Sequence, residues 1–316
     1  DTVTTGQDGK AMSKALYLGR YAVKETDAPE GYLLNAKDFE TELKYKDQNT
    51  EIVYADIRVE NEVAKGKIRI VKTDADTGKI IPEKAEFEIV AAEDIVTPGG
   101  AIKAKQGTVV DTVVSGENGR GVSGELHMGK YIVKEKCAPT GYLLNPEPRE
   151  VELDYKDQNT RVVYGNVTIA DMPARGKVVI TKTDSESGTF LAGAEFAITA
   201  ADDIITPDGT VRAEKGTVVD TVITNDEGKA YSKELFLGSY TVTEIKQPEG
   251  YVRSDQTWDV ELLYEDQNTS VVTETVDAQN VPTRFVLTKK EAGSEEHLQG
   301  VKFEFWEKDG SEESEK

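Results

Sequence analysis

Short runs of alternating polar and apolar residues recur along this chain, separated by turns rich in Gly, Pro, Asn and Asp. Alternation with a period of two places successive side chains on opposite faces of a β-strand, and no segment shows a sustained helical period. A short helix near residues 91–95 is the one exception that we expect. The predicted strands include residues 67–71, 87–90, 109–114, 131–133, 151–153 and 161–169.

The whole pattern repeats with a period of about 110 residues. The first ten residues return at 111–120 and again at 220–229, and Gly-Tyr-Leu-Leu-Asn at 31–35 returns at 141–145. A Lys-Thr-Asp triplet that begins at residue 72 recurs at residue 182, with a degraded copy at 289–291. Such duplication indicates tandem modules. We predict the C-terminal part of one module at 1–65, complete modules at 66–175 and 176–284, and the first strands of a further module at 285–316.

Each complete module holds several short strands, which is typical of an antiparallel β-sandwich with an apolar interior. The predicted fold class is therefore all-β, with tandem Ig-like sandwiches. Each complete module also carries a long insertion, at 92–107 and at 201–216. We interpret these insertions as plain connectors, with partner-binding loops as the alternative.

Composition narrows the possible functions. The chain has 316 residues, 37% of them hydrophobic, so ordinary cores can form, and its net charge is -21. That charge disfavours contact with nucleic acid or anionic membrane surfaces. With one cysteine, Cys137, and two histidines, neither an internal disulfide nor a Cys- or His-based metal site is expected. No apolar run is long enough for a membrane-spanning helix, and we expect no metal or other cofactor.

The alternation also directs polar groups toward the predicted interior. On the first strand of the module at 66–175, Lys72 shares a face with Ile68 and Ile70. The equivalent lysines of the next two repeats are Lys182 and Lys289. A middle strand of each repeat has a glutamate at an inward position: Glu25, Glu135 and Glu244. The closing strand has an Asn or Asp there: Asn61, Asp171 and Asn280.

Burying such groups singly costs several kcal/mol, so the three should meet one another. Desolvation favours the neutral amine of a lysine and the protonated form of a carboxyl. A neutral amine beside an amide or acid, with a second carboxyl to shuttle protons, is equipped to form an isopeptide bond, with loss of ammonia from Asn or of water from Asp. A triad held by hydrogen bonds alone is the alternative, because a one-residue slip of register turns every side chain to the other face.

Three segments of the module at 66–175 carry a family resemblance: Lys-Thr-Asp-Ala-Asp-Thr-Gly at 72–78, Ala-Glu-Phe-Glu-Ile at 85–89, and the stretch at 129–142 that ends in Glu-Lys-Cys-Ala-Pro-Thr-Gly-Tyr. They resemble the Cna B-type, or SpaA-type, repeats of Gram-positive adhesins and pilins, and the resemblance covers nearly the whole chain. It implies a prealbumin-like sandwich in which a first-strand lysine is joined to a last-strand Asn or Asp with help from the glutamate.

Carried onto this chain, the resemblance implies two complete crosslinking sites and two half-sites. The complete sites join Lys72 to Asp171 and Lys182 to Asn280, with Glu135 and Glu244 as the assisting acids. The half-sites are Glu25 with Asn61 in the first repeat, and Lys289 in the last. Asp171 departs from the Asn of the next module, so its bond would form by loss of water and requires a protonated acid.

These observations together predict a structural stalk on the surface or cell wall of a Gram-positive bacterium, not an enzyme with a separate substrate. Crosslinking is then a single-turnover reaction of each module with itself. The expected partners are neighbouring modules of the same chain, with host or microbial surface proteins contacted by distal domains and no nucleic acid or membrane contact in this segment. Adhesive modules whose insertions bind a protein, and accessory domains of a surface hydrolase, are the alternatives.

The two half-sites leave one more arrangement open. A second strand is expected at 301–306, and strands from 285–316 of one chain are complementary to residues 1–65 of another. Docking of this kind would place Lys289 beside Glu25 and Asn61.

Overall fold

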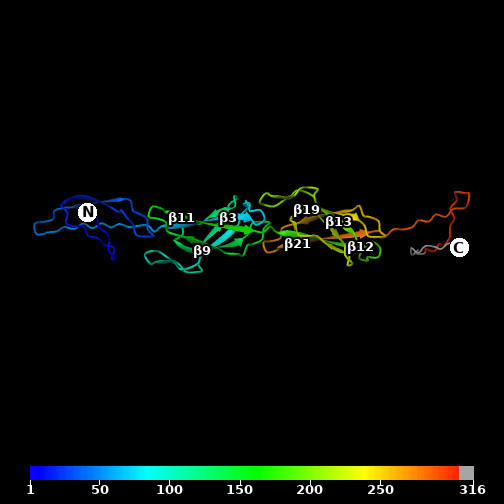
Figure 1. Ribbon diagram of the computed structural model, residues 1–316, viewed down its shortest axis with the longest axis horizontal. Helices are drawn as coiled ribbons and strands as arrows, with labels where there is room; N and C mark the ends of the chain where they lie inside the picture. Colours follow the sequence, from blue (N-terminus) through cyan, green and yellow to red (C-terminus); the bar gives the residue numbers. More distant parts are fainter. Residues whose placement is uncertain (306–316) are drawn as a thin grey trace, which may run out of the picture.

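The computed structural model describes residues 1–305, which form strands, turns and loops. Figure 1 shows an elongated molecule in which two β-sandwiches follow each other along the long axis, with residues 1–65 at one end and residues 285–305 at the other. The all-β fold class is thereby confirmed. No helix in residues 1–305 is long and apolar enough to cross a membrane. The short helix predicted near 91–95 is wrong, because this segment joins two strands across a bend.

The second module is a sandwich of two sheets with strand orders β10-β9-β4-β7 and β11-β3-β8, and its strands lie between residues 65 and 171. Its sheet strands are β3 (Lys65–Asp74), β4 (Glu86–Ala91), β7 (Val109–Val114), β8 (Arg120–Val122), β9 (Gly129–Cys137), β10 (Arg149–Leu153) and β11 (Val162–Asp171).

The third module repeats this plan between residues 175 and 280, with sheets β16-β13-β19-β20 and β21-β12-β17, and β18 also pairs with β12. Its sheet strands are β12 (Arg175–Asp184), β13 (Glu195–Ala200), β16 (Val218–Ile223), β17 (Lys229–Tyr231), β18 (Leu235–Phe236), β19 (Gly238–Lys246), β20 (Thr257–Leu262) and β21 (Val271–Asn280).

The first and last strands of each sandwich depart from the antiparallel pattern. β3 pairs in parallel with β11, and β12 pairs in parallel with β21. In this register Lys72 lies opposite Ile169, two residues before Asp171. Residues two apart on a strand face the same side, so the lysine and the acid point into the same interior. The third module places Lys182 opposite Ala278, two residues before Asn280, in the same way.

Alternation along these strands builds the two cores. On β3, Ile68 and Ile70 are buried together with Lys72, whereas Arg69 is exposed. These isoleucines belong to a cluster that also contains Phe87, Ile89, Tyr131, Val133, Leu153 and Ile169. The equivalent cluster of the third module contains Val178, Ile180, Phe196, Ile198, Tyr240, Val242 and Leu262. Because each large apolar side chain contributes about 1.5–3 kcal/mol on burial, these clusters provide the main stabilisation of each sandwich.

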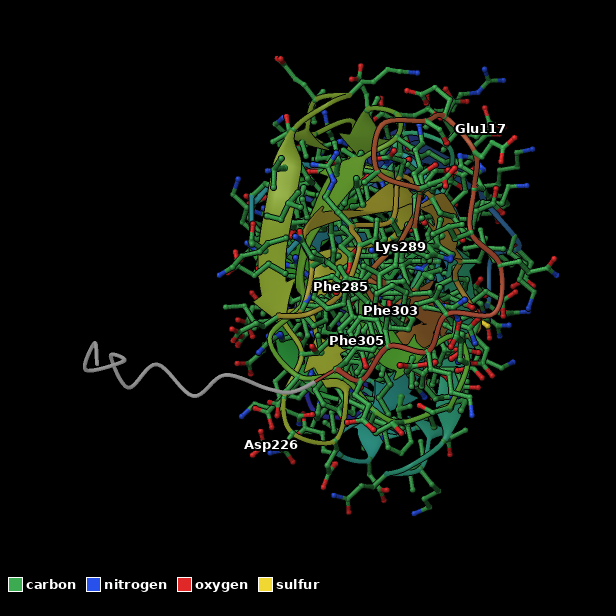
Figure 2. The ribbon with its side chains drawn as sticks, turned by 90° about the vertical axis from the view of Figure 1, so that its right-hand side faces the viewer. Glu117, Asp226, Phe285, Lys289, Phe303 and Phe305 are labelled. Atoms are coloured by element: carbon green, nitrogen blue, oxygen red, sulfur yellow. The ribbon has the colours of Figure 1, made fainter. Side chains whose placement is uncertain are left out.

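The chain on either side of the two sandwiches is much less enclosed. The N-terminal unit, residues 1–65, contains one hairpin of β1 (Gly19–Lys24) and β2 (Asp38–Leu43), and its tyrosines Tyr17, Tyr45 and Tyr54 are exposed. Residues 285–305 form no strand. Part of the strand predicted at 301–306 is therefore not formed, and Trp306 lies outside the described residues. Phe285 and Phe305 stack with ring centroids 5.7 Å apart (Figure 2).

The two insertions are folded hairpins. β5 (Ile95–Val96) pairs with β6 (Ile102–Ala104) in the second module, and β14 (Ile204–Ile205) pairs with β15 (Val211–Ala213) in the third. The turn of the third-module hairpin contacts the second module directly, for example through Thr77 and Asp208. The interpretation of the insertions as plain connectors is therefore wrong.

Candidate crosslinking sites

The second module brings its three predicted site residues together inside the sandwich. The ammonium nitrogen Nζ of Lys72 lies 2.8 Å from Oε1 of Glu135 and also contacts the carboxylate of Asp171. All three side chains have no exposed surface. The positions follow from the strands, since β3 and β11 are neighbours in one sheet while β9, which carries Glu135, faces them from the other.

The third module repeats the arrangement with an amide in place of the acid. Nζ of Lys182 lies 3.3 Å from Oε1 of Glu244, and Nδ2 of Asn280 donates to Oε2 of the same glutamate at 2.8 Å. The same Nδ2 also donates to the carbonyl oxygen of Val252 at 2.7 Å. Because both partners of Nδ2 are acceptors, the orientation of the amide is fixed. Its oxygen Oδ1 is buried without a hydrogen-bond partner among the described residues.

Each glutamate is held by a backbone N–H that strand alternation does not predict. Asn145 donates from its backbone to Glu135 at 2.9 Å, and Ser254 donates to Glu244 at 2.7 Å. Asn35 makes the equivalent bond to Glu25 at 2.6 Å. All three donors follow their glutamate by ten positions, and two of them end the recurring Gly-Tyr-Leu-Leu-Asn segment. The recurrence of this segment is visible in the sequence, but the hydrogen bond from its backbone to the glutamate forms only in the folded loop.

Burial changes the protonation of the reacting groups. The pKa of Asp171 is raised to about 7, mainly by burial, and the carboxylate of Glu135 adds to this rise while the ammonium of Lys72 opposes it. Burial also lowers the pKa of Lys182, although Glu244 opposes that change. Both shifts favour the uncharged forms, a protonated acid and a free amine, which are the forms that amide formation needs.

Glu244 touches both nitrogens between which a proton must move. Attack of the neutral Lys182 nitrogen on Cγ of Asn280 would form the Nζ–Cγ bond and break the Cγ–Nδ2 bond. One carboxyl oxygen is placed to take a proton from Nζ, and the other is placed to deliver a proton to the departing Nδ2. The nitrogen then leaves as ammonia. In the second module the same steps would release the hydroxyl of a protonated Asp171 as water.

The two half-sites stay separate in the structure. Nδ2 of Asn61 donates to both carboxylate oxygens of Glu25, at 2.9 and 2.7 Å, so this acid and amide are already assembled. Within residues 1–305 no lysine pairs with them. Lys289, which was expected to face inward, is exposed on the C-terminal segment at the other end of the molecule (Figures 1 and 2).

Metal-binding groups and reactive thiols are the other kinds of candidate site to consider in residues 1–305. Residues 1–305 contain no group of three or more His, Cys, Asp or Glu side chains arranged to hold a metal ion. Cys137 is a free, exposed thiol at the end of β9. The two buried triads are therefore the sites on which a function can be built.

Comparison with known proteins agrees with the repeated architecture. The SpaA prealbumin-like fold domain matches residues 1–58, 66–168 and 176–278. The structure of the Bacillus anthracis TIE protein is similar, with 29% sequence identity and a TM-score of 0.55, and the alignment covers 88% of this chain and 45% of that one. This chain thus spans less than half the length of that relative. No curated protein matches the sequence.

Two pilin structures are more distant. A streptococcal ancillary pilin has 20% identity and a TM-score of 0.30, over 85% of this chain and 76% of the pilin. The shaft pilin SpaA from Lactobacillus rhamnosus GG has 16% identity and a TM-score of 0.27, over 71% of this chain and all of that one.

Proposed function

Because this chain belongs to the family of SpaA prealbumin-like fold domains, we propose that it is a load-bearing stalk segment whose modules crosslink themselves through isopeptide bonds. The bonds join Lys72 to Asp171 and Lys182 to Asn280. Glu135 and Glu244 act as the proton shuttles. Each bond forms once, within its own module, so the chain has no separate substrate.

The observation that carries this proposal is the pair of triads with fully buried side chains. A buried ion pair is a weak source of stability, because desolvation of the two charges offsets most of their attraction. The bond from Lys72 to Asp171 removes the charges of both groups, and the bond from Lys182 to Asn280 removes the charge of the lysine. The buried triads are therefore costly as permanent ion pairs and well suited as precursors of a covalent bond.

The arrangement of the modules supports the proposal that this chain is a stalk segment. The two sandwiches follow each other in a row, and no long flexible linker separates β11, which ends at Asp171, from β12, which begins at Arg175. A stalk of this kind belongs on the cell surface, as the resemblance to Gram-positive adhesins and pilins implies. The partners of this segment are its neighbouring modules, and binding of host or microbial proteins is left to distal domains.

The mass of the folded protein tests the proposal. We expect it to fall below the sequence mass by one ammonia, from the Lys182–Asn280 bond, and by one water, from the Lys72–Asp171 bond. Peptide mapping by tandem mass spectrometry should find both crosslinked peptides, whereas Asn61 should keep its amide. A folded protein with the full sequence mass would contradict the proposal and leave two triads held by hydrogen bonds and ion pairs.

The lowered pKa of Lys182 gives a second prediction, for an Asn280→Ala variant that cannot crosslink. A lysine with a folded pKa below its ordinary value of 10.5 makes the unfolded state bind more protons, so stability rises with pH between these two values. The amide nitrogen of the linked wild type does not titrate. The deficit in Tm of the variant relative to the wild type should therefore shrink as the pH rises toward 10.5. A deficit that stays constant over this window in calorimetry would show that Lys182 does not titrate in the buried site.

A further inference from the structure

The inserted hairpin of the third module lies on the end of the second module. Its turn, residues 206–210, receives a hydrogen bond from Thr77 to Asp208 at 2.8 Å and another from Lys79 to Thr210 at 3.0 Å. Both donors belong to the turn that follows β3. The insertion therefore bridges two modules that are consecutive along the chain.

An arginine from the same hairpin reaches into the acidic turn after β3. Arg212 donates to Oδ2 of Asp74 at 2.9 Å and lies 3.6 Å from Asp76. Arg175, the first residue of β12, donates to Asp76 at 2.7 Å. Both guanidinium groups stack on the ring of Phe236, which holds their planes in place. The side chain of Asp74 is fully buried and that of Arg212 is only 11% exposed, so this pair is screened far less than a surface salt bridge.

The glycine of the Pro-x-Gly-Tyr segment makes room for the hairpin. A Cβ atom on Gly141 would lie 3.1 Å from Pro207, and at the preceding junction one on Gly31 would lie 2.3 Å from Pro98. On the third module, which has no following hairpin within residues 1–305, Gly250 has no atom within 4 Å of that position. Glycine at these positions therefore permits a positive φ and also close packing by the next module.

A second contact accompanies the hairpin at both junctions. The backbone N–H of Ala138 donates to the side-chain oxygen of Gln267 at 2.8 Å, and that of Leu144 donates to its carbonyl oxygen at 2.9 Å. Gln158 receives the same two bonds from Ala28 and Leu34, at 2.7 and 2.9 Å. These glutamines belong to an Asp-Gln-Asn-Thr segment that occurs at 47–50, 157–160 and 266–269. The same two hydrogen bonds thus occur at both junctions. A contact that formed by chance between loosely linked domains would not be repeated in this way.

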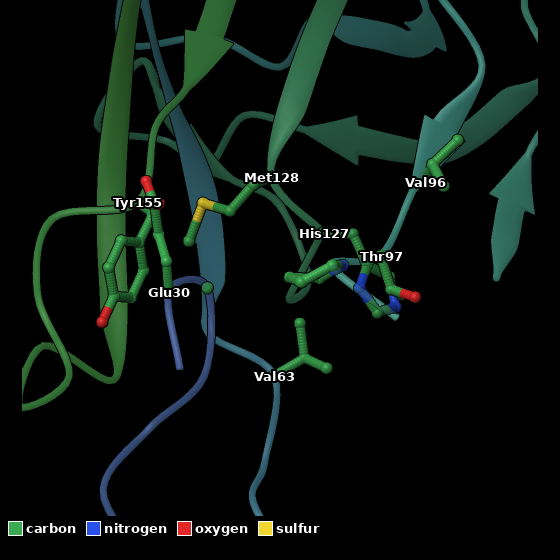
Figure 3. A pocket seen from close by; sticks show the side chains of 9 residues that line it. Glu30, Val63, Val96, Thr97, His127, Met128 and Tyr155 are labelled. Atoms are coloured by element: carbon green, nitrogen blue, oxygen red, sulfur yellow. The ribbon is translucent and has the colours of Figure 1, made fainter. Parts of the chain in front are cut away.

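The junction between the N-terminal unit and the second module has the basic residues of this contact but no counterparts of the acidic residues Asp74 and Asp76. Lys65 and Lys103 are the counterparts of Arg175 and Arg212, and His127 is the counterpart of Phe236. Nζ of Lys65 lies 2.6 Å from Nε2 of His127, and both residues line a hollow between the N-terminal unit and the second module. Figure 3 shows the neighbouring hollow, which His127 also lines. Burial and the neighbouring cations lower the pKa of both groups. The N-terminal unit has no strand equivalent to β3 within the described residues, and so supplies no acidic turn here.

From these contacts we infer that the acidic turn after the first strand of a module is a docking surface for the inserted hairpin of the next module and its arginine, and that this contact fixes the angle between them. The surface consists of Asp74, Asp76, Thr77 and Gly141. The partner is a β-hairpin with a proline at its turn and an arginine or lysine on its second strand. The inference does not depend on whether isopeptide bonds form.

Distance measurements between spin labels test the inference. Glu117 and Asp226 occupy equivalent exposed turns of the two modules (Figure 2) and can be replaced by cysteine in a Cys137→Ser background. Double electron–electron resonance should give one narrow distribution of label distances in the otherwise unchanged chain. Arg212→Ala should widen this distribution about twofold, because relative motion is the default for domains without a fixed interface. Thr77→Ala should widen it less.

Lys215→Ala is the matched control. Lys215 lies just beyond the same hairpin and pairs with Asp202 of its own module at 3.1 Å, so its loss should leave the distance distribution unchanged. Circular dichroism should show that all variants stay folded. An unchanged width in Arg212→Ala would overturn the inference. Equal widening in Arg212→Ala and Lys215→Ala would also overturn it, since the effect would then come from general loosening of the hairpin.

Discussion

Replacing Glu244 with alanine is expected to leave Lys182 and Asn280 unlinked and to lower the free energy of unfolding of the third module by about 4–5 kcal/mol, by analogy with a disulfide that closes a loop of about 100 residues. The module should still fold, because the apolar cluster around Phe196 and Tyr240 is untouched. For a domain of this size the loss corresponds to a fall in Tm on the order of 20 °C. Calorimetry and intact mass on the same sample give both results.

The N-terminal unit offers a matched control for this substitution. Glu25 accepts hydrogen bonds from Asn61 and from the backbone of Asn35, as Glu244 does from Asn280 and Ser254. Glu25→Ala should therefore leave the difference between the measured mass and the sequence mass as it is in the wild type. If the Glu244→Ala protein still lost ammonia at Asn280, the glutamate would not be the proton shuttle.

Pulling on the two ends of the chain is expected to separate the linked and unlinked proteins most clearly. Force enters the second module at the start of β3 and leaves it at the end of β11, and these strands lie parallel. A bond from Lys72 to Asp171 passes the load directly between them, so the rest of the module carries none. The wild type should therefore show no unfolding step for either sandwich in single-molecule force spectroscopy.

The Glu135→Ala, Glu244→Ala double variant should behave differently under the same load. Each sandwich should open in one step that lengthens the chain by roughly 300 Å, as expected for about 110 residues that become extended. Single variants should show one such step each, which assigns the step to its module. Steps of this length in the wild type would contradict the proposed load path.

Much of the fold could be predicted because strand alternation and the internal repeat can both be recognised in the sequence itself. Strand alternation placed Lys72 on the same face as Ile68 and Ile70, and all three are buried. The internal repeat then indicated the module boundaries and the equivalent positions in each repeat, although not which strands pair. The inward positions of Glu135 and Asp171 follow from the same alternation, and both side chains are buried beside the lysine.

The remaining features depend on contacts between segments that alternation does not connect. The parallel pairing of β3 with β11 is set by the path of the chain through both sheets. The docking of Arg212 on Asp74 joins residues that are far apart in sequence and belong to different modules. Lys289 was expected inside a sandwich, but its segment forms no strand within the described residues. The alternation of polar and apolar residues there therefore does not indicate which side chains are buried.

The parallel strands also determine where a protease can sever the stalk. Once Lys72 and Asp171 are joined, a cut in any loop between them opens the chain but leaves the two ends attached through the bond. Between the two crosslinked segments, residues 172–181 depend on a single backbone. Most of these residues lie in β12, and Ala174 donates to Gly141 at 2.9 Å beside the bridge from Tyr142 to Pro173. The stretch where one cut would part the rod is thus among the least accessible to a protease.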